Sequence, residues 1–288
     1  MAGRPLSRAP HDRVLDGDPA LREALERLAA AGRLVFVAGL PGTGKSLVIR
    51  ELARVAVHAG RRVHLLQWDV VRPVFEASAV GQRYPMVDGV THPIVRRAVG
   101  LWARRAVAAW ERRHAGAEHL LIGETPLVGG RLIELVRPVN DAAEPLLSAR
   151  ACRFVIAVPS VEVRRFIEGE RDRRAERPRH AREREDAPPS VMRALWRELL
   201  DVAHQMGIVG TGDTAYDPDV YRLVYERLLR RRHADAIRLD TILPTTDLSV
   251  YDLAVPRRDL LPDAHDAEAA MEDAEARGAG DVERWWTV

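Results

Sequence analysis

Residues 34–46 have the sequence LVFVAGLPGTGKS, and this stretch decides the fold of the chain. The first five residues form an apolar run between glycines, which is typical of a buried parallel strand. Residues 39–46 match the pattern G-x-x-x-x-G-K-[S/T] in full. An amphipathic helix is expected next, from about Lys45 to Ala59, with Gly60 as its end. A strand, a glycine-rich turn and a helix in this order predict a phosphate-binding loop.

The chemistry of such a loop follows from its backbone. Glycines permit conformations that side chains would forbid, so that N–H groups turn inward around a phosphate at a helix N-terminus. We expect Lys45 to reach the β- and γ-phosphate oxygens and Ser46 to place its hydroxyl on Mg²⁺. The residues expected to hold ATP are Gly39, Pro41, Gly42, Thr43, Gly44, Lys45, Ser46 and Leu47.

Lysine occurs once in the chain, at Lys45, and every other Lys or Arg position is arginine. An arginine presents a planar fork, whereas a lysine presents a compact point charge on a flexible stem. Coincidence is the alternative explanation, but retention of the single lysine inside the phosphate-binding pattern favours a functional one.

Strands and helices alternate along the rest of the chain, which predicts an α/β fold with a doubly wound, mostly parallel five-stranded sheet. The loop at 73–92 and the glycine-rich connector at 207–214 show no regular period, and Gly129-Gly130-Arg131 is expected to open a helix. The further strands are expected at 63–68, 119–122, 153–158 and 236–239, and the further helices at 93–114, 191–206 and 219–232.

Three segments are distinguished by composition. Residues 1–16 are polar and are expected to be a disordered lead-in, 17–256 form one domain, and 257–288 form an acidic tail with a weak helix. Trp285-Trp286 near the end of this tail is expected to dock back on the domain, with binding of a partner as the alternative.

Composition excludes several classes of protein. With 47% hydrophobic residues the chain can bury a sizeable core, but no apolar run reaches the ~18 residues that a membrane span needs. One cysteine excludes an internal disulfide framework, and a cytoplasmic location is the default expectation. The 44 basic and 42 acidic side chains are interspersed, so a nucleic-acid-binding stripe is not expected. Oligomeric state is not readable from the sequence.

Two carboxylates follow strands whose ends should face the ligand crevice. Asp69 follows the second strand and could act as a base on an acceptor hydroxyl, with Arg72 holding the acceptor; alternatively, Asp69 only caps a turn. Glu124 follows the third strand and is expected near Mg²⁺, although its longer arm could reach the acceptor instead. Which of the two carboxylates acts on the acceptor and which lies near Mg²⁺ stays open. Gly129, Gly130 and Arg131 could shape the acceptor pocket.

Residues 160–186 are dense in arginine and in acidic residues. One interpretation is a lid, about 160–190, whose arginines close over the phosphates; the other is a solvated helical face with i,i+4 pairs. The lid candidates are Arg164, Arg171 and Arg174, and Arg171 is taken as catalytic together with Lys45, Asp69, Arg72 and Glu124. His64, His92 and His119 are interpreted as packing or surface residues, and no Cys/His spacing predicts zinc.

With these features the chain resembles the P-loop kinases that include zeta toxins, gluconate kinase and chloramphenicol phosphotransferase. The resemblance covers about 33–240 and rests on residues 39–46, Asp69 with Arg72, Glu124, and the arginine-bearing segment. It implies a five-stranded parallel sheet, a lid, ATP with Mg²⁺, Asp69 as base and Arg72 as an acceptor-binding residue. Glu124 departs from the usual Asp, and the long segments 73–92 and 207–217 leave the acceptor undefined.

The sequence therefore predicts an ATP- and Mg²⁺-dependent phosphotransferase that acts on a hydroxyl of a small molecule. Two alternatives stay open: an ATP-binding regulatory or adaptor protein with slow hydrolysis, suggested by the tail and the long connector, and a kinase that acts on a nucleotide or RNA end.

Overall fold

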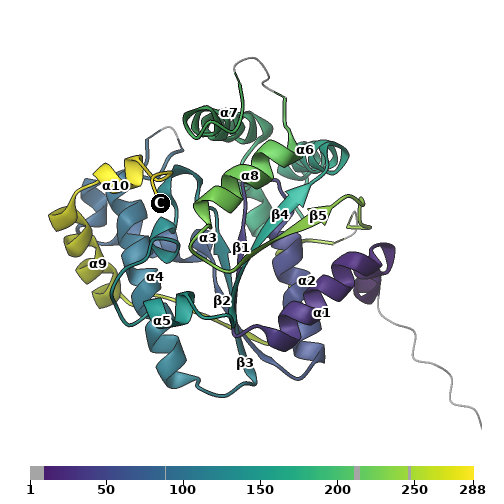
Figure 1. Ribbon diagram of the computed structural model, residues 1–288, viewed down its shortest axis with the longest axis horizontal. Helices are drawn as coiled ribbons and strands as arrows, with labels where there is room; N and C mark the ends of the chain where they lie inside the picture. Colours follow the sequence, from purple (N-terminus) through teal and green to yellow (C-terminus); the bar gives the residue numbers. More distant parts are fainter. Residues whose placement is uncertain (1–9, 88, 211–214, 246–247) are drawn as a thin grey trace, which may run out of the picture.

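Strand β1 (Leu34–Ala38) is the apolar run that precedes the glycine-rich loop, and all five of its residues are buried. The computed structural model describes residues 10–87, 89–210, 215–245 and 248–288. In it, β1 lies inside a six-stranded sheet of order β5-β4-β1-β3-β2-β6, and every pair of neighbours is parallel (Figure 1). The predicted α/β class and parallel sheet are confirmed.

The predicted number of strands was wrong by one. The expected strands are present as β2 (Arg62–Leu66), β3 (His119–Thr125), β4 (Cys152–Pro159) and β5 (Ala234–Leu239). The sixth, β6 (Arg257–Asp259), pairs with Val63–Leu65 at the edge of the sheet. Its three residues are charged and exposed, so it carries no apolar pattern by which a strand could be predicted.

Helices cover both faces of the sheet, because alternate residues of each strand point to opposite sides. Val35 and Val37 pack with α1 (Pro19–Ala31) and α2 (Lys45–His58) on one face. Leu34 and Phe36 belong to the larger core on the other face. That core also contains residues of α3 (Trp68–Ala77), α4 (Pro93–Arg113), α7 (Pro189–Gln205), α8 (Pro218–Leu228) and α9 (Ala264–Arg277).

Several local expectations differ from the structure. Helix α3 occupies the start of the segment expected to be a loop, followed by a short 3₁₀ helix at Gly81–Arg83. The helix expected from Gly129 is replaced by 3₁₀ turns at Val128–Gly130 and Ile133–Leu135, because positive φ at Gly129 and Leu132 interrupts a regular helix. Helix α5 (Glu144–Leu147) follows.

Part of the expected lead-in and the arginine-rich segment form helices. A 3₁₀ helix at Pro10–Gly17 covers the end of the expected lead-in, whose residues 1–9 lie outside the described part of the chain. Residues 211–214 of the expected connector lie outside it as well. The arginine-rich segment forms α6 (Val161–Glu176) and a 3₁₀ helix at Ala181–Glu185. No described helix has the length and apolar character needed to cross a membrane.

The segment expected to be a tail is part of the fold. After β6, helix α9 packs against α4 through alanines and Met271, and α10 (Gly280–Glu283) follows beside it (Figure 1). Trp285 is only 2% exposed, and its indole Nε1 donates a hydrogen bond to Glu198 Oε1 on α7 at 3.1 Å. Docking of Trp285 on the domain is confirmed.

The tryptophan pair gives a matched test of this packing. We expect Trp285→Ala to lower the free energy of unfolding by about 3–5 kcal/mol, because a large buried side chain and its hydrogen bond are lost. Trp286 is partly buried next to it, so Trp286→Ala should cost clearly less. Urea denaturation followed by circular dichroism measures both, and equal losses would contradict the proposed anchoring by Trp285.

Candidate functional site

The loop between β1 and α2 lies at the carboxyl end of an interior strand. Strand β1 has β3 on one side and β4 on the other, so the chain connections diverge at this point, where open α/β sheets bind ligands. Gly44 has φ +84°, and a Cβ on it would lie 2.7 Å from Leu239 Cδ1. A Cβ on Gly39, φ +154°, would lie 2.5 Å from the Tyr221 hydroxyl oxygen. The loop conformation therefore requires glycine at both positions.

The backbone of this loop presents a row of free donors. No described residue accepts a hydrogen bond from the N–H groups of Gly42 to Ser46. Two carbonyl oxygens of the loop accept hydrogen bonds from side chains and hold it in place. The Thr43 hydroxyl donates to Leu40 O at 2.8 Å, and Arg164 Nη1 donates to Pro41 O at 3.3 Å. Consecutive N–H groups at the start of a fourteen-residue helix form an anion-binding nest.

Lys45 and Glu124 form a buried ion pair beside the nest. The Lys45 Nζ is 3.5 Å from Glu124 Oε1 and donates to Leu40 O at 2.9 Å, and the two side chains are only 6% and 10% exposed. Burial lowers the pKa of Lys45 and raises the pKa of Glu124, although the attraction between the two charges opposes both shifts. Removal from water thus favours the neutral forms, and an anion bound nearby would favour the charged lysine.

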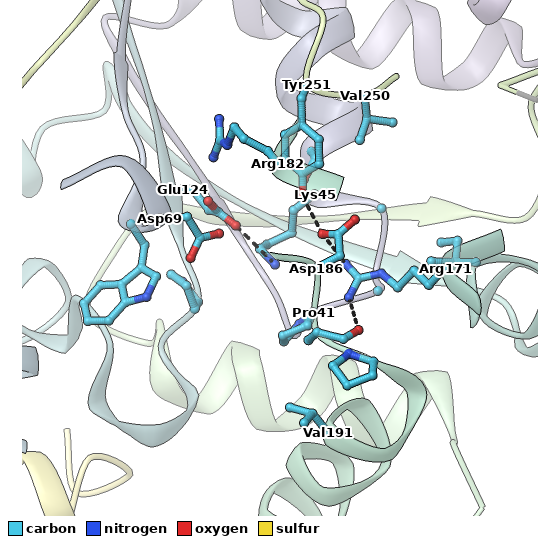
Figure 2. Close-up of a pocket in the computed structure, with 18 of the residues that line it drawn as sticks. Pro41, Lys45, Asp69, Glu124, Arg171, Arg182, Asp186, Val191, Val250 and Tyr251 are labelled. Atoms are coloured by element: carbon cyan, nitrogen blue, oxygen red, sulfur yellow. Dashed lines mark hydrogen bonds and ion pairs between the residues drawn. The ribbon is translucent and has the colours of Figure 1, made fainter. Parts of the chain in front are cut away.

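Asp69 and Arg72 reach the same space from the first turns of α3. Figure 2 shows the Asp69 carboxylate beside Glu124, in a cavity of about 480 Å³. Asp69 is exposed, and no described residue donates a hydrogen bond to its carboxylate. Arg72 also lines the cavity, while its guanidinium is bound to Glu76 at 2.8 and 2.9 Å. Asp69 is therefore the more available of the two carboxylates to a molecule in the cavity.

Arginines of the arginine-rich segment form the opposite wall. Arg171 donates to Ala187 O at 2.7 Å and lies 3.4 Å from Asp186 (Figure 2). Arg174 donates to Thr245 O at 2.9 Å. Both line the cavity with Lys45, whereas the third candidate, Arg164, is buried behind the loop and does not. The cations on this wall can approach phosphates that are bound at the nest.

The structure brings most of the residues selected from the sequence into this single cavity. Gly39, Thr43 and Arg164 are the exceptions, because the first two belong to the loop but face away from the cavity and Arg164 is buried behind the loop. The expected residues that line the cavity are Pro41, Gly42, Gly44, Lys45, Ser46, Leu47, Asp69, Arg72, Glu124, Arg171 and Arg174.

Several lining residues were not selected from the sequence. Trp68 precedes Asp69, and Asp186 accepts a short hydrogen bond from the Tyr251 hydroxyl. Arg182 stacks over the Tyr251 ring, with its Cζ 4.7 Å from the ring centroid. Arg131, considered only for the shape of the acceptor pocket, lines the cavity too, and burial lowers its pKa. Only the arginine-rich composition around Arg182 could have indicated one of these positions.

The donor chemistry fits the ligands that the sequence predicts. Ser46 and Glu124 supply oxygen atoms, which Mg²⁺ prefers, and the adjacent Thr125 hydroxyl is buried without a hydrogen-bond partner among the described residues. The free N–H groups and Lys45 suit a polyphosphate. The arrangement can thus hold a Mg²⁺–polyphosphate with a second molecule beside Asp69.

Comparisons of the chain with protein-family models, curated proteins and solved structures found no match.

Anion binding at the nest can be tested by one substitution and a matched control. We expect inorganic triphosphate to raise the melting temperature of the protein, and Gly44→Ala to weaken its binding at least tenfold, because the Cβ distorts the loop. Gly60 also has a positive φ, +79°, but has open space around it and lies outside the cavity, so Gly60→Ala should retain binding. Titration calorimetry provides the affinities, and equal binding by both variants would place the anion elsewhere.

Proposed function

We propose that this protein is an ATP- and Mg²⁺-dependent phosphotransferase that transfers the γ-phosphoryl group to a hydroxyl of a small acceptor. One observation carries the proposal: a complete phosphate-binding loop with free N–H groups shares a cavity with an exposed carboxylate, Asp69. The proposal takes the parallel sheet to be that of a P-loop kinase-like domain, consistent with the position of the loop at the end of β1.

In this proposal one group of residues binds ATP with Mg²⁺, and Asp69 acts on the acceptor. The N–H groups of the loop and Lys45 hold the phosphates, and Ser46 and Glu124 hold Mg²⁺, which neutralises charge on the phosphate oxygens. Asp69 accepts the proton of the acceptor hydroxyl while the hydroxyl oxygen forms a bond to the γ-phosphorus. The bond between the γ-phosphorus and the bridging oxygen of the β-phosphate breaks, and ADP leaves. The burial of Glu124 against Lys45 supports this assignment, because it leaves Asp69 as the accessible base.

The arginine wall fits the role of a lid. The partners of Arg171 and Arg174 are carbonyl oxygens and carboxylates, which phosphate oxygens can replace. A guanidinium at this place would stabilise charge on the transferring group and help to exclude water.

The structure gives less support to the alternatives. The regulatory hypothesis was motivated by the acidic tail and the long connector. The tail residues of β6, α9 and Trp285 belong to the fold, and residues 211–214 of the connector lie outside the described part of the chain. The second alternative is a kinase that acts on a nucleotide or RNA end. A basic channel would favour it, but the cations near Asp69 are accompanied by acids: Arg72 is bound to Glu76, and Glu198 lies near Arg131.

Acceptor-dependent ADP release tests the function directly. A pool of metabolites, nucleosides and short oligonucleotides is screened with ATP and Mg²⁺, with Lys45→Ala as the blank. For an acceptor found in this way, we expect Asp69→Asn to reduce kcat by about 10²–10⁴-fold, since the base is lost. Asp201→Asn, at an exposed position of α7 outside the cavity, should retain kcat. An unchanged kcat in Asp69→Asn would show that Asp69 is not the base. A rate of ADP release that no tested acceptor increases would overturn the transferase proposal.

A second prediction concerns the lid. We expect Arg171→Gln to reduce kcat about 10–10³-fold while leaving the melting temperature nearly unchanged, because one cation near the phosphates is removed. Arg173, two residues along the same helix, is 67% exposed and lies outside the cavity. Arg173→Gln is therefore the matched control, and equal kcat values for the two variants would show that α6 is only a solvated surface.

A further inference from the structure

Three histidines that are far apart in the sequence meet at the other end of the sheet. His64 is the middle residue of β2, His114 follows the last turn of α4, and His119 is the first residue of β3. Their ring centroids are 4.5 Å (64–114), 5.1 Å (64–119) and 4.6 Å (114–119) apart. Glu124 is five residues further along β3 than His119, which corresponds to ~16 Å. The cluster is thus separate from the cavity.

The nitrogen atoms are arranged as a set of metal ligands would be. One ring nitrogen from each histidine lies within 4.8 Å of those of the other two. His64 Nε2 and His119 Nδ1 are 2.9 Å apart. In a tetrahedral zinc site with Zn–N bonds of about 2.0–2.1 Å, ligand nitrogens are separated by ~3.4 Å. Small rotations of the rings would therefore bring all three to bonding distance of one ion.

A carboxylate orients one of the rings. Glu118 Oε1 lies 3.4 Å from His119 Nε2, on the side of the ring away from His64. This carboxylate favours a proton on Nε2 and leaves the lone pair of Nδ1 directed at the cluster. Metal-binding histidines generally have such a carboxylate partner at the second nitrogen.

The surroundings of His64 and His119 favour the uncharged imidazole, which is the form that binds a metal. Burial and the two neighbouring imidazoles lower the pKa of His64 to about 4, and Arg258 and Arg33 act in the same direction. Burial, His114 and the nearby Arg62 and Arg33 also lower the pKa of His119. Much of the nearest positive charge is compensated, because Arg33 is 3.0 Å from Glu111 and donates to the carbonyl oxygens of Gly116 and His119 at 2.8 Å. His64 and His119 are buried, while His114 is half-buried and gives access from solvent.

We propose that His64, His114 and His119 bind one divalent ion of a late first-row transition metal, Zn²⁺ or a close neighbour, with water as the fourth ligand. Three neutral imidazoles suit Zn²⁺, Cu²⁺, Ni²⁺ and Co²⁺ and disfavour Mg²⁺ and Ca²⁺, which prefer oxygen. The ion would join β2 to β3 and to the end of α4, which is itself connected to β3 by residues 114–118. The proposal does not depend on the phosphotransferase function.

Cobalt and zinc titrations of the untagged, full-length protein test the site. We expect one Co²⁺ per chain with the intense visible absorption of a four- or five-coordinate ion. Zn²⁺ should displace it and, at about a hundred times its Kd, raise the melting temperature by ~5–10 °C. His114→Asn should weaken Co²⁺ binding at least a hundredfold. His265→Gln, on the exposed surface of α9, and Glu124→Gln, in the cavity, should leave the absorption unchanged.

Three results would overturn the proposal: no stoichiometric binding, a Co²⁺ spectrum of six oxygen ligands, or the same affinity in His114→Asn. X-ray absorption of the unmodified zinc protein gives a second measurement that does not depend on the folding of a variant. It should show scattering from three imidazole rings, and fewer than three would contradict the assignment.

Discussion

The turn from β1 into α2 leaves its N–H groups free, and it requires residues without a Cβ at two places where φ is positive. The glycines at 39 and 44 meet this requirement, since a Cβ at either would collide with Tyr221 or Leu239. The same turn starts α2 at Lys45 and so directs the one lysine toward β3. Because neighbouring parallel strands end at the same edge, Glu124 and Asp69 arrive beside it. The site is thus a consequence of one backbone conformation at one edge of the sheet.

The charges around this edge form two groups that differ in burial. Lys45 and Glu124 are almost completely removed from water and are held 3.5 Å apart, so either alone would be costly to bury. The arginines opposite are half-buried and bound to carbonyl and carboxylate oxygens. A buried pair on the sheet and half-buried cations on α6 would suit the proposed binding and release of a polyphosphate. A lysine is well suited to the first position and an arginine fork to the second.

The sequence predicted the parts of the site that depend on local patterns. The loop is a contiguous motif, and Glu124 and Asp69 could be placed because each follows an apolar strand. Asp186 and Tyr251 could not, because their pairing joins residues 65 positions apart that lack any periodic signal. The same holds for the three histidines: His64 and His119 were expected to be packing or surface residues, and His114 was not singled out. Strand β6 was missed because pairing with β2, and not its own composition, makes it a strand.

The geometry of Glu124 is set by its own strand. All seven residues of β3 are buried, and a Cβ on Gly123 would lie 2.3 Å from the Phe36 ring of β1, so β1 and β3 are in close contact just before the carboxylate. His119 begins the same strand, and its imidazole is hydrogen-bonded to His64 of β2. A metal ion among the histidines would therefore tie the middle of β2 to the amino end of β3, while the packing of Gly123 on Phe36 positions Glu124 at the carboxyl end of β3. On this arrangement a metal should add stability to the sheet without repositioning the carboxylate that faces Lys45.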